Sequence, residues 1–380
     1  MFAVVVHAGA GFHAPSNEST YKDACLNACL AAAQILERSN TTFPAIDAAT
    51  SAVSVLEDSY ITNAGYGSCL NFDGYVECDA GLMCGKSLVF TSVGSVSNVK
   101  NPIEIPRHLI LRHLTEPASV IGRVKPLSLC GDGARRYASE VAGLPLTPDN
   151  RLISKSARSS WRKYRALVDE HESNVVDAST RNGNSREGLS SSLKRSRIWD
   201  RLDTVGAVCL DISGNICAAS SSGGIPLKIG GRVGQACIYG CGSWAEVTPS
   251  VSVGCVTSGT GEQLIKTQLA QRIASEILVE KNKPIPDVVN NAFQREFLAS
   301  RFLAKETTEK FGGVVGLCRT PGDTQDPYLP RVVELFFKHS TKSLAYAYFV
   351  SGAMKKPKAE ISRMSHGSST ASNYYAFACK

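Results

Sequence analysis

The feature that most constrains this chain is an abrupt boundary near residue 203, where a polar and basic stretch meets an apolar one. From about Arg151 the sequence is dominated by Ser, Arg, Lys and Asn, and residues 177–192 show little apolar periodicity, as in a flexible surface linker. Residues 205–212 read instead as a buried strand. A linker that stops against a core strand is a natural position for a processing cut between Asp203 and Thr204. Taken alone, the boundary fits an ordinary surface loop at least as well.

The basic stretch also carries most of the charge of the chain. Residues 151–203 hold 12 Lys and Arg against 7 Asp and Glu, which is +5 of the total net charge of +7. The charge therefore characterises this segment and not the fold. Two short basic clusters, 162–165 and 194–197, fit either a split nuclear-import signal or a solvated linker. Direct nucleic-acid binding is disfavoured, because both clusters lie in a segment that is expected to be mostly loop.

Cysteine usage and hydropathy exclude several classes of protein. The chain has 13 cysteines and no CxxC pair, which predicts reduced, mostly buried thiols in the cytosol or nucleus and argues against a zinc site. Residues 1–7 read as a first buried strand and not as a signal peptide. No run of 18 uncharged apolar residues is present, so a membrane partner is not expected.

Hydrophobic periodicity predicts helices and strands that are grouped in blocks. Helices are expected over 21–38, 45–58, 134–141, 161–170, 263–280 and 285–302, and strands over 3–7, 74–79, 87–96, 205–212, 216–220, 311–317, 332–337 and 343–349. A tight glycine-rich turn is expected over 7–11. Because the blocks do not alternate strictly as βαβ units, the order favours a layered α+β sandwich.

A predicted hairpin brings two hydroxyl groups together. If the turn centres on Ser213, residues whose numbers sum to 426 lie opposite each other, and Thr204 and Ser222 meet this condition. Their Cβ atoms should then be about 5 Å apart. The following Gly223-Gly224 leaves room for a ligand. Since Ser and Thr are common residues, a purely structural pair fits the same pattern equally well.

Two motifs further along the chain suit recognition of negative charge. Arg232 lies among glycines in the segment 231–235, and its guanidinium fork suits a carboxylate. The small residues of 257–261 directly precede a predicted helix, where exposed backbone N–H groups can form an oxyanion hole. The alternative is a plain capped helix start with Glu262 in its first turn. Each motif is weak by itself.

Together these pieces resemble the N-terminal-nucleophile hydrolases of the plant-type asparaginase family. The matching segments follow the family's order over nearly the whole chain: HAGAG at 7–11, NAGYGS at 63–68, Asp79 with GKSL at 85–88, DTVGAV at 203–208, SSGG at 221–224, GRVG at 231–234 and SGTGE at 258–262.

Within that family the chain is most similar to the threonine aspartases, the taspase branch, which cut proteins after aspartate. The separating features are Asp203 before the nucleophile, Ser222 where the asparaginases usually have Thr, Gln235 where they have Asp, and the long basic insert. One departure from this branch is Asn17, which stands where the taspases have a lysine that helps to bind substrate.

The resemblance implies a four-layer αββα sandwich, a single domain over residues 1–380. It also implies cleavage into fragments 1–203 and 204–380, which remain associated. A Thr hydroxyl needs a base to become a nucleophile. When the Thr204 hydroxyl attacks the Asp203 carbonyl, the ester that results is hydrolysed by water. The cut frees an α-amine with an ordinary pKa of about 7.7–8, which can act as that base. No metal or cofactor is required.

The resemblance also assigns roles to individual residues. They are Thr204 as nucleophile and base, Ser222 as its hydrogen-bond partner, Arg232 as ligand of the substrate aspartate, Gln235 as partner of a substrate amide, Ser258 and Gly259 as the oxyanion hole, Gly9 as support for the substrate backbone, and Asn63 as a brace of the nearby loop. A plain structural turn is an equally good account of Asn63. His7 is expected to be a core histidine and not a catalyst.

The expected partners are protein substrates with Asp before the scissile bond, the two fragments of the chain and a second such pair. The branch acts on transcription and chromatin regulators, which favours the import reading, an import receptor and a nuclear or cytoplasmic location.

The first alternative to an endopeptidase is an amidohydrolase for asparagine or isoaspartyl peptides. Gln235 argues against it, because a neutral amide cannot pair the ammonium of free asparagine. The second is an inactive binding scaffold, against which the intact set of site residues argues.

Overall fold

The computed structural model describes residues 1–38, 40–180, 203–320 and 331–379. Its strands are β1 Ala3–Gly11, β2 Cys78–Cys84, β3 Val89–Val96, β4 Ser128–Cys130, β5 Val205–Leu210, β6 Ile216–Ser222, β7 Ser243–Val247, β8 Ser252–Gly259, β9 Gly312–Thr320, β10 Arg331–His339, β11 Ser343–Val350, β12 Lys358–Arg363 and β13 Ala371–Cys379. Its α-helices are α1 Glu18–Arg38, α2 Pro44–Glu57, α3 Glu104–Thr115, α4 Gly131–Glu140, α5 Asp149–Leu152, α6 Lys155–Thr180, α7 Gly261–Thr267, α8 Leu269–Val279 and α9 Ile285–Ala292.

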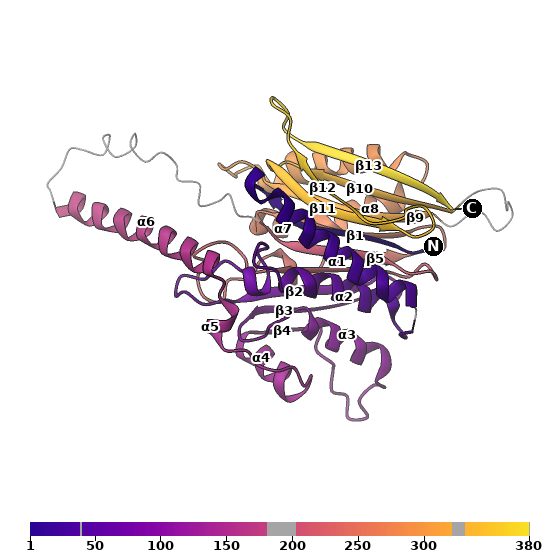
Figure 1. The fold of residues 1–380 in the computed structure, drawn as a ribbon, viewed down its shortest axis with the longest axis horizontal. Coiled ribbons are helices and arrows are strands. Elements are labelled where there is room, and N and C mark those ends of the chain that lie inside the picture. Colours follow the sequence, from indigo (N-terminus) through magenta and orange to yellow (C-terminus); the bar gives the residue numbers. More distant parts are fainter. Residues whose placement is uncertain (39, 181–202, 321–330, 380) are drawn as a thin grey trace.

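The strands form two sheets that stack between layers of helices (Figure 1). Within the described residues the larger sheet has the order β12-β11-β1-β5-β6-β2-β3-β4, and the smaller one has the order β13-β10-β9-β8-β7. Helices α1 and α2 cover the outer face of the larger sheet, and α8 and α9 cover the outer face of the smaller sheet. The predicted αββα sandwich is therefore confirmed.

The alternation of side chains along β1 divides the core in two. Val4 and Val6 face α1 and α2, whereas Ala3 and Val5 face the second sheet, because successive side chains of a strand point to opposite faces. The helices over the first face are rich in Ala, and α1 also buries two Cys residues, so both helices present small side chains to the sheet.

The expected turn over residues 7–11 is wrong, because β1 runs on through these residues to Gly11. The ladder between β1 and β11 shifts register between His7 and Ala10, and Gly9 in this bulge has a φ of 114°. A bulge adds one residue and changes which face the following side chains occupy. Ala10 accordingly packs between the sheets, on the side of Ala3.

The predicted hairpin register is confirmed. Strands β5 and β6 pair Val205 with Ser221 and Gly206 with Ser220, as a turn centred on Ser213 requires. Other boundaries differ from the prediction. The helix expected over 263–280 is divided at Gln268, whose φ is 48°, and the strand expected at 74–79 begins at Cys78. Strands β4, β7, β8, β12 and β13 were not predicted.

The basic insert begins as helices and not as the linker expected from about residue 151. The helix predicted over 161–170 extends over Lys155–Thr180 as α6 (Figure 1). Its first turns are anchored, since the Trp161 indole donates to the Asn71 carbonyl (2.9 Å) and Arg165 lies 3.8 Å from the centre of the Phe72 ring. The cluster 162–165 is thus helical.

Two predictions for the insert concern residues that lie entirely or mostly beyond this helix. The cluster 194–197 and most of the segment 177–192 lie outside the described residues.

In the part of the chain that the structure describes, no helix has the length and hydrophobicity to cross a membrane.

Candidate active site

Thr204 lies immediately before β5 and has three polar partners, two on its hydroxyl and one on its backbone N–H. The residue is 3% exposed. Its backbone N–H donates to Ser258 Oγ (3.1 Å). Its hydroxyl accepts from Gln235 Nε2 (2.6 Å) and donates to Ser222 Oγ (3.4 Å). The two hydroxyls that the hairpin register pairs are therefore hydrogen-bonded, with Thr204 as the donor.

Ser258 and Gly259 end β8 beside this residue. Ser258 Oγ accepts from the backbone N–H of Ala10 (2.9 Å) as well as from that of Thr204, so one hydroxyl ties the bulge of β1 to the start of β5. Gly259 has a φ of 140°, and a Cβ there would lie 2.3 Å from the Phe311 carbonyl oxygen. Both the backbone angle and the space require glycine.

Asp203 is buried next to Gly9. The residue is 1% exposed. A Cβ on Gly9 would lie 2.6 Å from the Cβ of Asp203 and 2.7 Å from its Cα. These separations are shorter than any normal contact, so only glycine lets the bulge of β1 approach the residue before Thr204. The bond between Asp203 and Thr204 is thus enclosed between β1 and the end of β8.

Asn63 braces the glycine segment that follows β6. Its side-chain amide donates to the Gly224 carbonyl (2.7 Å), its Oδ1 accepts from the Cys69 N–H (2.8 Å), and its own carbonyl accepts from the Gly223 N–H (2.8 Å). The Gly224 N–H in turn donates to Ser222 Oγ (3.0 Å). Asn63 acts on the site through Gly224 and Ser222.

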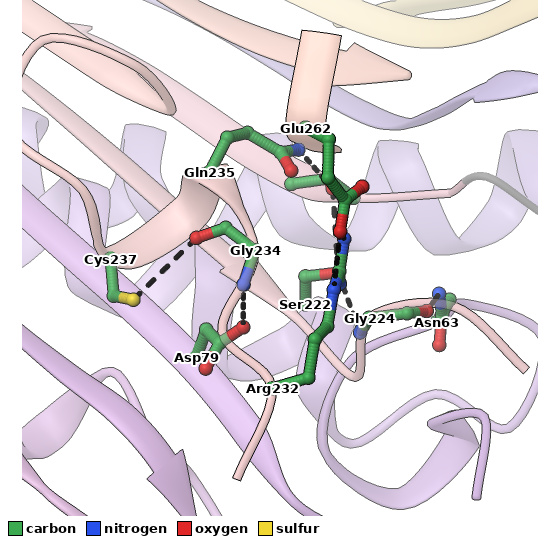
Figure 2. Close-up of polar contacts among 10 residues, drawn as sticks. Asn63, Asp79, Ser222, Gly224, Arg232, Gly234, Gln235, Cys237 and Glu262 are labelled. Atoms are coloured by element: carbon green, nitrogen blue, oxygen red, sulfur yellow. Dashed lines mark hydrogen bonds and ion pairs between the residues drawn. The ribbon is translucent and has the colours of Figure 1, made fainter. Parts of the chain in front are cut away.

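Arg232 is paired with Glu262 (Figure 2). Its Nε (2.9 Å) and Nη2 (2.7 Å) both donate to Glu262 Oε1. Three glycines leave the space for the guanidinium: added Cβ atoms would lie 3.0 Å from Nη1 at Gly224, 3.2 Å from Nη1 at Gly234 and 2.7 Å from Nη2 at Gly261. The arginine predicted to bind a substrate carboxylate thus already holds a carboxylate of the protein.

Asp79 was matched only as part of a family motif, and the structure gives it a position beside Arg232. Its carboxylate accepts from the backbone N–H groups of Gly234 (2.7 Å) and Ser95 (2.8 Å). Burial raises the pKa of Asp79, and the nearby charges of Lys228 and Arg232 oppose this rise. The contact with Gly234 fixes the segment between Arg232 and Gln235.

Lys228 was missed by the sequence analysis. It is 2% exposed, and its ammonium donates to the Glu77 carbonyl (2.8 Å). A Cβ on Gly224 would lie 3.4 Å from Lys228 Nζ and 3.0 Å from Arg232 Nη1, so two cations flank one glycine of the site. The available signal was a single charge inside the otherwise apolar and glycine-rich segment 223–231.

Glu57 and Ser221 form a second buried polar pair, behind the hairpin. The Ser221 hydroxyl donates to Glu57 Oε1 (2.6 Å), which also accepts from the Ile103 N–H (3.1 Å). Burial raises the pKa of Glu57 from 4.5 to about 8. Ser221 directly precedes Ser222 on β6, so the pair anchors the strand that presents Ser222 to Thr204. Nothing in the spacing of these residues predicted the pair.

His7 is enclosed in the core. Burial and, to a lesser degree, the neighbouring His13 lower the pKa of His7 to about 3. Its Nδ1 accepts from the Gly9 N–H (3.3 Å). A neutral histidine that stabilises the bulge of β1 agrees with the expectation that it is a core residue.

Comparison with known proteins supports one family. A family model described as asparaginase matches residues 1–320. An isoaspartyl peptidase/L-asparaginase of Danio rerio is 32% identical over 316 residues, which cover 82% of this chain and 84% of that protein. One of Xenopus laevis is 32% identical over 271 residues, 71% of this chain and 74% of that protein. A plant-type L-asparaginase of Pyrobaculum calidifontis is 32% identical over 305 residues, 80% of this chain and 87% of that protein. With its layered sandwich and its buried threonine at the start of β5, the chain belongs to the asparaginase family of N-terminal-nucleophile hydrolases.

Proposed function

We propose that this chain is the precursor of a threonine endopeptidase. It cuts its own Asp203–Thr204 bond and then cuts protein substrates after aspartate. The self-cleavage is supported by the burial of both residues and by the approach of Gly9 to Asp203. The Thr204 hydroxyl also has a donor, Gln235, and an acceptor, Ser222.

The first reaction is an acyl shift within the chain. The Thr204 oxygen attacks the Asp203 carbonyl, the C–N bond breaks, and the nitrogen gains the proton that the hydroxyl loses. Water then hydrolyses the ester and leaves an Asp203 carboxylate and a Thr204 α-amine. This nitrogen lies 3.1 Å from Ser258 Oγ in the precursor. After the cut it can accept the hydroxyl proton in later turnovers.

The observation that carries the choice of substrate is Gln235. Its buried amide lies against the nucleophile, with 2.6 Å between Nε2 and Thr204 Oγ1. Free asparagine brings an α-ammonium into such a site, and a neutral carboxamide provides no charge to pair it. The unpaired ammonium should cost several kcal/mol. A peptide has an amide at that place, which a glutamine can hydrogen-bond.

The relatives support a second candidate. The curated proteins described above carry the names isoaspartyl peptidase/L-asparaginase and plant-type L-asparaginase, which favours an amidohydrolase over an endopeptidase. An isoaspartyl peptide also brings a carboxylate that Arg232 can bind. The two candidates share the nucleophile and the self-cleavage and differ in the substrate.

The test compares three substrates on the mature protein, with Thr204→Ala as the inactive control. They are a decapeptide with the sequence of residues 199–208, a β-aspartyl dipeptide and free asparagine. We expect cleavage of the decapeptide after the aspartate that corresponds to Asp203, and negligible release of ammonia from asparagine. Ammonia release or β-aspartyl hydrolysis without cleavage of the decapeptide would assign the protein to the second candidate.

We also propose a nuclear location, on the basis of the two basic clusters of the insert. A fluorescent protein fused to residues 151–203 should accumulate in nuclei. Replacing the four Lys and Arg residues of 162–163 and 194–195 with Ala should abolish this. A cytoplasmic distribution of the unaltered fusion would remove the import reading and leave the enzymatic proposal untouched.

A further inference from the structure

The pair between Arg232 and Glu262 raises the question of how a substrate carboxylate reaches the arginine. Both Nε and Nη2 of Arg232 donate to the same oxygen of Glu262. The Arg232 side chain is 15% exposed and that of Glu262 is 52% exposed. The arginine is therefore held in the wall of the site, whereas its partner lies at the surface, in the first turn of α7 (Figure 2).

The guanidinium lies beside the nucleophile's own partner. A Cβ on Gly261 would be 2.7 Å from Arg232 Nη2 and 2.9 Å from Gln235 Oε1, so these two groups border the same small space. The other end of the Gln235 amide contacts the Thr204 hydroxyl. A carboxylate bound to this edge of Arg232 would thus be next to the reactive residue.

We propose that Glu262 is a specificity-determining residue, an internal carboxylate that occupies Arg232 until a substrate carboxylate displaces it. This rests on the proposed function only in requiring that Arg232 binds a carboxylate of the substrate. Two carboxylates repel each other at one donor edge, so Glu262 must leave when the substrate binds. Leaving costs little, because the half-exposed carboxylate of Glu262 regains water and the substrate carboxylate takes its place on the arginine.

A competing internal ligand has a defined kinetic signature. It weakens binding of a substrate that brings a carboxylate, because the binding-competent state is only part of the population. It does not change the chemical step, since Glu262 has already left when Thr204 attacks. Glu262 therefore raises KM for Asp-containing substrates and leaves kcat unchanged. A substrate with Asn in place of Asp has no carboxylate at that position and therefore does not compete with Glu262 for Arg232.

The experiment measures kcat and KM of mature Glu262→Gln on the 199–208 decapeptide and on the same peptide with Asn at the cleavage position. We expect KM for the Asp peptide to fall about five-fold, as loss of an ordinary competing ion pair would give, with kcat within about two-fold. KM for the Asn peptide should not change. Glu262→Asp, whose carboxylate is one methylene farther from Arg232, should give a smaller fall in KM.

Glu306→Gln is the matched control. It also removes a carboxylate that pairs with a residue of α7, but that residue is Lys266 and not Arg232. A rise in KM for Glu262→Gln would overturn the proposal and make Glu262 an orienting residue. An unchanged KM, or an equal change for both peptides, would overturn it as well. If the decapeptide is not cleaved by the wild type, the proposed endopeptidase fails. The same comparison of KM on a β-aspartyl dipeptide, which also brings a carboxylate, then decides the role of Glu262.

Discussion

Replacing Gly9 with Ala should slow self-cleavage about a hundred-fold while the protein still folds. The added Cβ would lie 2.6 Å from the Cβ of Asp203, whereas carbon atoms in contact are normally about 3.5–4.0 Å apart. Asp203 would therefore have to move by about 1 Å. A misplacement of that size at a reacting group costs roughly a hundred-fold in rate.

The substitution also strains the backbone, because Gly9 has a φ of 114°. Strain of this kind costs about 1–3 kcal/mol in unfolding free energy. Gly352→Ala separates strain from steric contact, since Gly352 has a φ of 80° and nothing lies within 4 Å of its added Cβ. This control should lose stability and mature at the normal rate.

The assay is intact mass spectrometry of freshly folded protein over time, together with denaturant unfolding. We expect conversion of Gly9→Ala into fragments 1–203 and 204–380 to be about a hundred-fold slower than that of the wild type. Maturation of Gly9→Ala at a rate within about three-fold of wild type, with stability lowered, would refute the argument that Gly9 positions Asp203.

Three further predictions concern single residues. Thr204→Ala should remain a single chain, whereas Thr204→Ser, which keeps a hydroxyl, should convert slowly; N-terminal sequencing that finds the wild type uncut after long incubation would exclude self-cleavage. Arg232→Ala should lower kcat/KM on Asp peptides by two orders of magnitude or more, with a much smaller loss of stability; equal wild-type cleavage of matched Asp and Asn peptides would contradict its role. Glu57→Gln should protect the protein at alkaline pH. Burial raises the Glu57 pKa from 4.5 to about 8, so between these pH values the folded protein holds a proton that the unfolded chain releases. The contribution of this proton to the unfolding free energy is complete below pH 4.5 and is lost as pH rises through 8. The fall in unfolding free energy between pH 5 and 9 should shrink by up to about 4 kcal/mol, and an unchanged pH dependence would show that Glu57 is not protonated in the folded state.

The parts of the site that were predictable from the sequence are those that local geometry determines. A two-strand hairpin with a short turn has one register, and the register alone brings Thr204 to Ser222. Gly9 was expected to support the substrate backbone, which stays a prediction, and the structure shows instead its close approach to Asp203. Its conformation was misjudged, since a turn and a bulge both use a glycine at positive φ.

The parts that were not predictable depend on contacts between distant segments. Glu57 and Ser221 are 164 residues apart in sequence, and neither has a neighbour that indicates the other. The insert was misjudged for a related reason. Ala157, Trp161 and Tyr164 have helical spacing, but they line a small pocket together with residues 69–70 and 226–227. Only the folded sandwich brings these segments together.

Glu262 combines both situations. From the sequence it is an acidic residue in the first turn of a helix, where it stabilises the helix dipole wherever its side chain points. That local account is sufficient, so nothing in the sequence requires a second role. The structure adds that the same carboxylate accepts two hydrogen bonds from an arginine 30 residues earlier. The helix start holds the backbone of Glu262 in place, and its side chain is 52% exposed, as the proposed exchange of Arg232 for water requires. A residue with one local reason for its presence and one long-range contact is where sequence reasoning stops too early.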